Sequence, residues 1–156
     1  AGGLEASATR RLTVPALGRD RFTALVRARQ LLEPEAAADA LPYLDGEAVA
    51  ALDGVDAALS AAIRAQDVAG YMRLNYRFHF GIYRAVPGSV LCPLIESLWM
   101  QFGAYMHLLF DRAPAHLGAD RHQAALAAIR TGDAAALRAA IAADIDDALR
   151  TLQAAG

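Results

Sequence analysis

The sequence has one cysteine, no lysine and no long uncharged apolar run. With Cys92 alone, an intramolecular disulfide is excluded and a reducing cytoplasm is favoured. No segment approaches the roughly 18 uncharged apolar residues of a membrane span, and residues 1–11 lack the apolar middle region of a signal peptide. All 15 basic residues are arginines and the net charge is only -2, so no basic face marks a nucleic-acid surface and we expect this chain alone not to bind DNA.

The chain also lacks any Glu-x-x-His pair, which di-metal enzymes built on helical bundles repeat on two helices. A mononuclear hydrolase would need an open coordination position and a general base. The nearest carboxylates for that role are Asp144 and Glu33. A bundle metalloenzyme of the hydrolase type is therefore kept as the alternative to a binding domain.

Helical periodicity fills most of the sequence. A hydrophobic content of 56% in 156 residues allows one sizeable core. Apolar residues recur at three- and four-residue steps over about 20–41, 48–63, 68–86, 91–109, 120–131 and 134–154. Asp67 and Asp133 are placed to cap helices, Gly132 to end one, and only Leu12-Thr13-Val14 looks extended. We predict an all-α antiparallel bundle of about six to seven helices.

Four polar residues interrupt the apolar stripes. Asn75 and His79 lie four apart in the third predicted helix, His122 lies in the first turn of the fifth, and Asp144 lies at the centre of the last. Isolated ionisable groups are costly to bury, so we expect these four side chains to converge. Two neutral imidazoles, a carboxylate and an amide oxygen suit zinc or nickel, with iron or manganese as further candidates.

Other residues point to an anionic ligand beside that metal. Arg29 lies on the apolar stripe of the first helix and offers a fork for a carboxylate. Gln101 and Tyr105, four apart, would add a polar edge to the cavity. Two plainer alternatives stay open: a buried Arg29–Asp144 salt bridge without a metal, and a dimerisation module whose polar residues serve packing specificity.

The motifs in this order resemble a known family. They are Arg29-x-x-x-Glu33-Pro34, Asn75-x-x-Phe78-His79, His122 before an apolar helix, Gly132-Asp133, and Asp144. The pattern, over roughly residues 21–153, is similar to the FCD effector domain of GntR-type bacterial transcriptional regulators. The resemblance implies a small-carboxylate effector next to a divalent metal, a homodimer, and DNA binding through a winged helix-turn-helix domain ahead of this one.

Two departures from that family bear on the site and on the domain organisation. Asn75 stands where metal-binding members carry aspartate, and Asp144 stands where they carry a last-helix histidine, so we expect weaker metal binding. No winged-helix sequence precedes the bundle in residues 1–19. We therefore interpret 1–19 as a linker that follows a missing DNA-binding domain, and 20–156 as the ligand-binding domain.

Overall fold

Six α-helices make up most of the part of the chain that the structure describes. The computed structural model describes residues 5–6, 12–13, 19–112 and 119–154, with side chains over 20–103, 121–147 and 149–150. The helices are α1 (Arg19–Ala40), α2 (Gly46–Arg64), α3 (Val68–Tyr83), α4 (Leu91–Arg112), α5 (Ala119–Thr131) and α6 (Ala134–Ala154), and a 3₁₀ turn, Leu41–Tyr43, follows α1. The predicted all-α bundle is confirmed.

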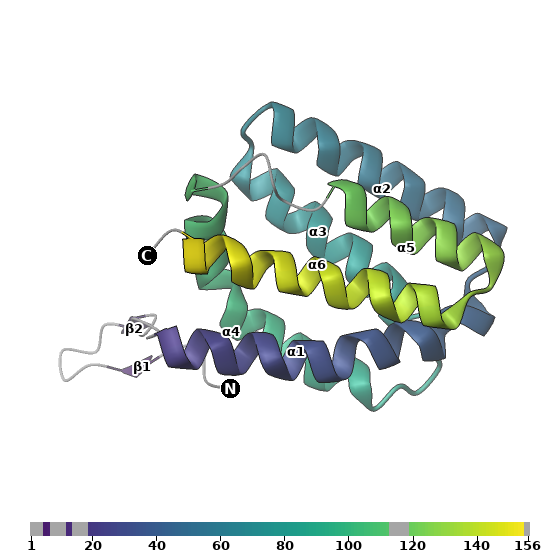
Figure 1. Ribbon diagram of the computed structural model, residues 1–156, viewed down its shortest axis with the longest axis horizontal. Helices are drawn as coiled ribbons and strands as arrows, with labels where there is room; N and C mark the ends of the chain where they lie inside the picture. Colours follow the sequence, from purple (N-terminus) through teal and green to yellow (C-terminus); the bar gives the residue numbers. More distant parts are fainter. Residues whose placement is uncertain (1–4, 7–11, 14–18, 113–118, 155–156) are drawn as a thin grey trace.

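The two described strands are short. β1 (Glu5–Ala6) pairs antiparallel with β2 (Leu12–Thr13), with Glu5 opposite Thr13. They lie outside the helical bundle (Figure 1). The extended conformation expected at Leu12-Thr13 is confirmed, while Val14 lies outside the described residues. The prediction that no other segment is extended is wrong, because Glu5–Ala6 pairs with this strand.

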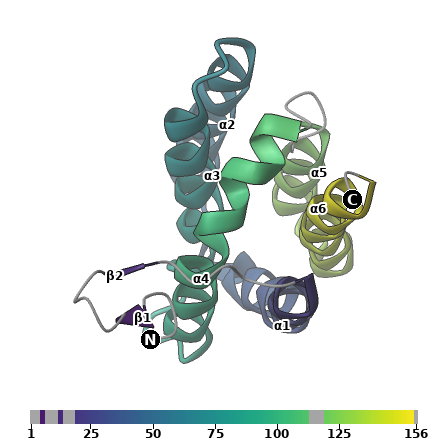
Figure 2. The same cartoon turned by 90° about the vertical axis from the view of Figure 1, so that its left-hand side faces the viewer.

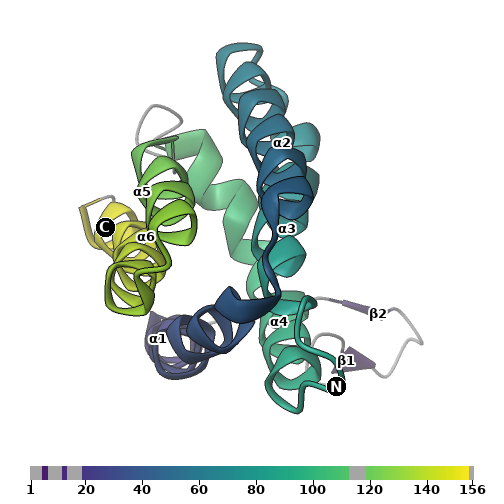
Figure 3. The ribbon, with the colours of Figure 1, turned by 90° about the vertical axis from the view of Figure 1, so that its right-hand side faces the viewer.

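Four of the helices form two antiparallel hairpins, which contact each other through α2 and α5. α2 and α3 pack together on one side, and α5 and α6 pack together on the other (Figures 2 and 3). α1 lies against α6 and α4, while α4 crosses the foreground of Figure 2. Buried residues from all six of these helices belong to one hydrophobic core.

Short polar residues set several helix ends. The side chains of Asp45, Asp67 and Asp133 each accept a 2.9 Å hydrogen bond from a backbone N–H in the first turn of α2, α3 and α6. Such caps satisfy N–H groups that have no partner within the helix. Gly132 ends α5 at φ 69°, a left-handed conformation that glycine adopts without steric cost. The sequence-based predictions for Asp67, Gly132 and Asp133 are confirmed.

The core is apolar with a polar centre. Apolar side chains from α1 to α6 are buried, among them Phe78, Ile82, Leu126 and Ile141. No helix in the described ranges is both long and apolar enough to span a membrane. Buried polar groups need partners. Among the described side chains, the buried polar ones are Arg29, Glu33, Asp56, Asn75, His79 and His122.

Candidate metal and effector site

Three of the predicted metal ligands meet in the interior. His79 of α3, His122 of α5 and Asp144 of α6 each offer one ligand atom, and these atoms lie within 4.8 Å of one another. The Nε2 atom of His79 is 3.2 Å from Asp144 Oδ2, and that of His122 is 3.8 Å from Asp144 Oδ1. Three different helices thus place two imidazoles and a carboxylate around one point.

The two imidazoles present their Nε2 atoms there without a hydrogen-bond partner. Among the described residues, His79 Nε2 and His122 Nε2 are the buried side-chain polar atoms that lack one. Leaving a buried polar atom unpaired is costly, and two such atoms beside one carboxylate form a donor set that suits a divalent cation. The residues present therefore fit a metal.

A second carboxylate, that of Asp56, bonds the other ring nitrogen of His122. Its Nδ1 atom lies 2.9 Å from Oδ1 of Asp56, which is 3% exposed and belongs to α2. Gln123 Nε2 donates to the other oxygen of Asp56 at 2.6 Å, and the Phe78 ring stacks on the imidazole at 3.9 Å. Metal-bound histidines commonly bond a carboxylate through the second ring nitrogen. Asp56 supplies that support here.

His79 is supported through a tyrosine and a buried carboxylate. Its Nδ1 atom lies 3.0 Å from the hydroxyl of Tyr83, one turn later on α3. That hydroxyl donates to Glu33 Oε2 at 2.8 Å, and Trp99 Nε1 donates to Glu33 Oε1 at 2.9 Å. Arg29 Nε also donates to Glu33 Oε1, at 2.5 Å. Glu33 is therefore the common acceptor for groups from α1, α3 and α4.

Arg29 pairs with Glu33 rather than with Asp144. The guanidinium lies 4.4 Å from the ring centroids of both Trp99 and Phe102, and it is buried. Burial lowers the pKa of Arg29, but the charge and hydrogen bonds of Glu33 raise it further, so the net shift is upward. The metal-free alternative, a direct Arg29–Asp144 salt bridge, is wrong because the guanidinium ion-pairs with Glu33.

The charge states around the cluster follow from the same neighbours. Burial raises the pKa of the Asp144 carboxyl, but the His79 ring beside it, then His122 and Arg29, lower it to a net value below normal. Burial and Glu33 raise the pKa of Tyr83 well above its ordinary value. Asp144 is therefore an anion near neutral pH, and Tyr83 stays a protonated hydroxyl that can donate.

The remaining predicted residues are less central. Asn75 is buried one turn before His79 on α3, and its place as a fourth ligand stays a prediction. The Gln101 amide accepts from Arg21 at 2.5 Å and donates to the Ser97 backbone oxygen at 3.2 Å. Neither of these two contacts joins Gln101 to the cluster. The side chain of Tyr105 lies outside the described residues.

Sequence reasoning missed Asp56 and Tyr83 as supporting residues. Asp56 lies four residues after Leu52 and three before Leu59, hence on the buried stripe of α2. Tyr83 lies four after His79 on the stripe of α3. The same test that identified His79, a polar group on an apolar stripe, would have identified Asp56. For Tyr83 it would not, because a tyrosine on an apolar stripe is ordinarily a packing residue.

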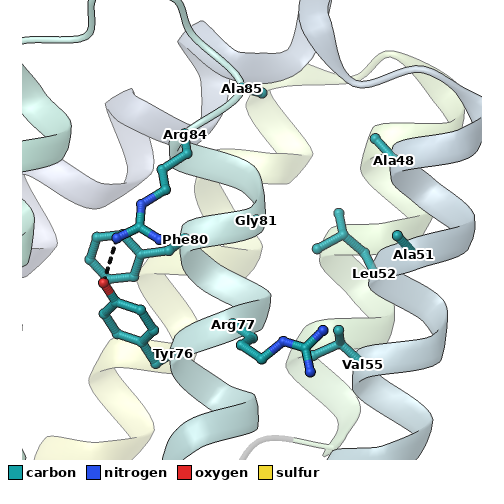
Figure 4. A pocket seen from close by; sticks show the side chains of 10 residues that line it. All are labelled: Ala48, Ala51, Leu52, Val55, Tyr76, Arg77, Phe80, Gly81, Arg84 and Ala85. Atoms are coloured by element: carbon teal, nitrogen blue, oxygen red, sulfur yellow. Dashed lines mark hydrogen bonds between the residues drawn. The ribbon is translucent and has the colours of Figure 1, made fainter.

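A separate groove lies between α2 and α3, on the opposite face of α3. It has a volume of about 480 Å³ and a largely alanine and leucine wall on α2. Figure 4 shows Arg77 reaching from α3 towards Val55 of α2, and Arg84 bonded to Tyr76. Residues of the polar cluster do not line it. α3 therefore presents its histidine face to the interior and its arginines to the outside.

Comparisons with known proteins agree with the fold and the motifs. The model of the FCD domain family matches residues 24–147. The chain is 30% identical over 124 residues to the HTH-type transcriptional regulator McbR of Escherichia coli (strain K12), an alignment that covers 78% of this chain and 56% of that protein. The chain thus spans little more than half the length of this relative.

Solved structures give the same result. E. coli McbR/YncC superposes with a TM-score of 0.88 at 26% identity, covering 99% of this chain and 78% of that one. A GntR family member from Pseudomonas syringae pv. tomato str. DC3000 gives 0.73 at 19% identity, with coverages of 98% and 64%. Streptococcus agalactiae GntR gives 0.64 at 20%, with coverages of 96% and 75%. These last two likenesses concern the fold alone.

The family predicted from the motifs is confirmed. The same comparisons favour an effector-binding regulatory domain over the enzyme alternative. By the match over residues 24–147 and the identity to a curated regulator, the chain belongs to the FCD domain family.

Proposed function

We propose that this domain senses a small organic acid at a divalent metal held by His79, His122 and Asp144, with Asn75 as the fourth protein ligand. The observation that carries the proposal is the pair of buried, unpartnered Nε2 atoms beside one carboxylate. When bound, the cation supplies a positive centre for the effector's oxygen atoms. Zinc or nickel fits this mixed nitrogen and oxygen set best, with iron or manganese as weaker candidates.

Charge and access support an anionic effector of small size. Arg29 is neutralised by its ion pair with Glu33, so the bound cation would be the main positive charge that an anionic effector meets. The two histidines are at most 1% exposed, whereas the Asp144 side chain keeps 14% exposure. The acid would therefore approach past Asp144, and the burial of both histidines favours a short carboxylate over a bulky one. Gln101 and Tyr105 remain proposed effector contacts.

The proposed regulatory role also involves a second copy of the chain and a DNA-binding domain. We propose that a cytoplasmic regulator contains this domain, dimerises through it, and contacts DNA through an N-terminal domain that residues 1–19 join to it. Exposed apolar residues on α1 and α4 support self-association: Leu31, Leu94 and Met100 are 64%, 52% and 66% exposed. Effector binding would then act by favouring one arrangement of the two copies.

Metal and organic acids together test the proposed function. We expect protein purified without chelator to contain one transition metal per site by plasma mass spectrometry. Zinc added to stripped protein at about a hundredfold excess over Kd should stabilise it by about 2.7 kcal/mol, which raises Tm by several degrees. Short carboxylates should raise Tm further only with metal present. Consumption of the acid would instead support the metalloenzyme, and no response to metal or acid would support a packing module.

The support of His122 by Asp56 gives a sharper prediction. Asp56→Asn should weaken zinc binding by about 10–100-fold, because the imidazole loses the carboxylate that orients it. Isothermal titration of stripped protein with zinc would measure this. Asp53→Asn is the matched control: it lies on the same helix and pairs with Arg130 at 2.6 Å on the surface, so its zinc affinity should equal that of the parent. Equal affinities in both variants would contradict the role of Asp56.

A further inference from the structure

We propose that Tyr83 and Glu33 are positioning residues that fix the tautomer of His79, so that its Nε2 atom is unprotonated before any metal arrives. The inference rests on the proposed metal site, since it states how one ligand is prepared for it. It follows from the direction of each hydrogen bond in a chain of four buried side chains, which runs from Arg29 through Glu33 and Tyr83 to His79.

Glu33 accepts a hydrogen bond from each of its partners in this network. Glu33 Oε1 accepts hydrogen bonds from Arg29 Nε and Trp99 Nε1. Glu33 Oε2 accepts one from Arg29 Nη2 at 3.3 Å. Arginine and the indole N–H can only donate, and an ionised carboxylate can only accept. The Tyr83 hydroxyl, 2.8 Å from Oε2, must therefore place its single proton towards Glu33.

The proton position on His79 follows from this. With its proton committed to Glu33, the Tyr83 oxygen offers lone pairs to His79 Nδ1 at 3.0 Å, so Nδ1 must carry the hydrogen. A neutral imidazole has one N–H, which leaves Nε2 with a free lone pair. In that tautomer the Nε2 lone pair faces Asp144 Oδ2 at 3.2 Å, an arrangement that a cation between the two atoms would stabilise.

His122 has the same tautomer, and here a carboxylate bonds Nδ1 directly. Its Nδ1 donates directly to Asp56, so its Nε2 is also unprotonated. Both imidazoles therefore carry their proton on Nδ1, but the acceptor is the Tyr83 hydroxyl for His79 and the Asp56 carboxylate for His122. His79 depends on a hydroxyl that a tyrosine to phenylalanine change removes while leaving the ring in place.

Nitrogen-15 NMR of metal-free protein tests the proposal without using metal binding. At a pH high enough for the His79 ring to be neutral, the parent should show it protonated at Nδ1. In Tyr83→Phe, Nδ1 loses its acceptor, and the proton should move to Nε2, where Asp144 can accept it. Because that proton must then leave before a metal binds, zinc affinity should fall by about 10–100-fold.

Tyr76→Phe is the matched control. It removes a hydroxyl on the same helix that donates to the carboxylate of Glu96 at 2.5 Å, away from the cluster. Tautomer and zinc affinity should stay as in the parent. A parent His79 protonated at Nε2, or a Tyr83→Phe variant with unchanged tautomer, would overturn the relay. A parent that shows the Nδ1–H tautomer yet binds no zinc would support the relay while refuting the proposed metal function.

Discussion

Replacing Glu33 by alanine is expected to lower the free energy of unfolding by about 3–5 kcal/mol, the usual loss when one partner of a buried ion pair is removed. Arg29 would keep its charge in an interior where both residues are at most 3% exposed. Trp99 and Tyr83 would also lose their acceptor. Urea unfolding followed by circular dichroism measures the difference.

Two further variants identify the cause of that loss. Replacing Arg29 and Glu33 together by methionine removes both charges at similar volume, and should recover a large part of the stability. Glu35→Ala is the control, because Glu35 pairs with Arg138 on the surface, where both side chains are about half exposed; its unfolding midpoint should hardly move. A Glu33→Ala variant as stable as Glu35→Ala would show that Glu33 is not the acceptor that the buried pair requires.

The second large effect concerns the metal. His79→Ala should abolish stoichiometric metal binding, because it removes one of the three clustered ligand groups. The loss should exceed the roughly 10–100-fold that removal of a supporting hydrogen bond costs. The effector-dependent rise in Tm should disappear with the metal. Plasma mass spectrometry of the purified variant and zinc titration of the stripped variant are the two measurements.

The helical fold should survive this change, because His79→Ala shortens one side chain and buries no new charge. Far-ultraviolet circular dichroism checks that point. Glu96→Ala, which removes a surface carboxylate from α4 that pairs with Arg84 at 2.7 Å, should keep its metal. A His79→Ala variant that retains one ion per chain would show that the metal, if bound, lies elsewhere.

Much of this architecture could be predicted because the information is local. Helical periodicity and capping residues such as Asp67 and Asp133 depend on neighbours within one or two turns. Polar residues on apolar stripes identified His79, His122 and Asp144, which the structure brings together. Their convergence was inferred from the cost of burying each alone, and that cost is a property of the residue type rather than of the fold.

The partners of those residues could not be predicted in the same way. Periodicity tells which face of a helix is buried, but not which faces meet at the same height. Asp56 and His122 are 66 residues apart, and their contact depends on how α2 packs against α5. The apolar stripes allow a pair between Arg29 and Asp144, although the partner of Arg29 in the structure, Glu33, lies one turn away. Helical spacing alone allows that pair, so a local rule was available.

The polar network takes at least one side chain from each helix: Arg29 and Glu33 from α1, Asp56 from α2, His79 and Tyr83 from α3, Trp99 from α4, His122 from α5 and Asp144 from α6. No shorter fragment of the bundle would assemble it. An ion seated there would cross-link the middle and the end of the polypeptide much as a disulfide does, and its binding free energy would count in full towards keeping the chain folded.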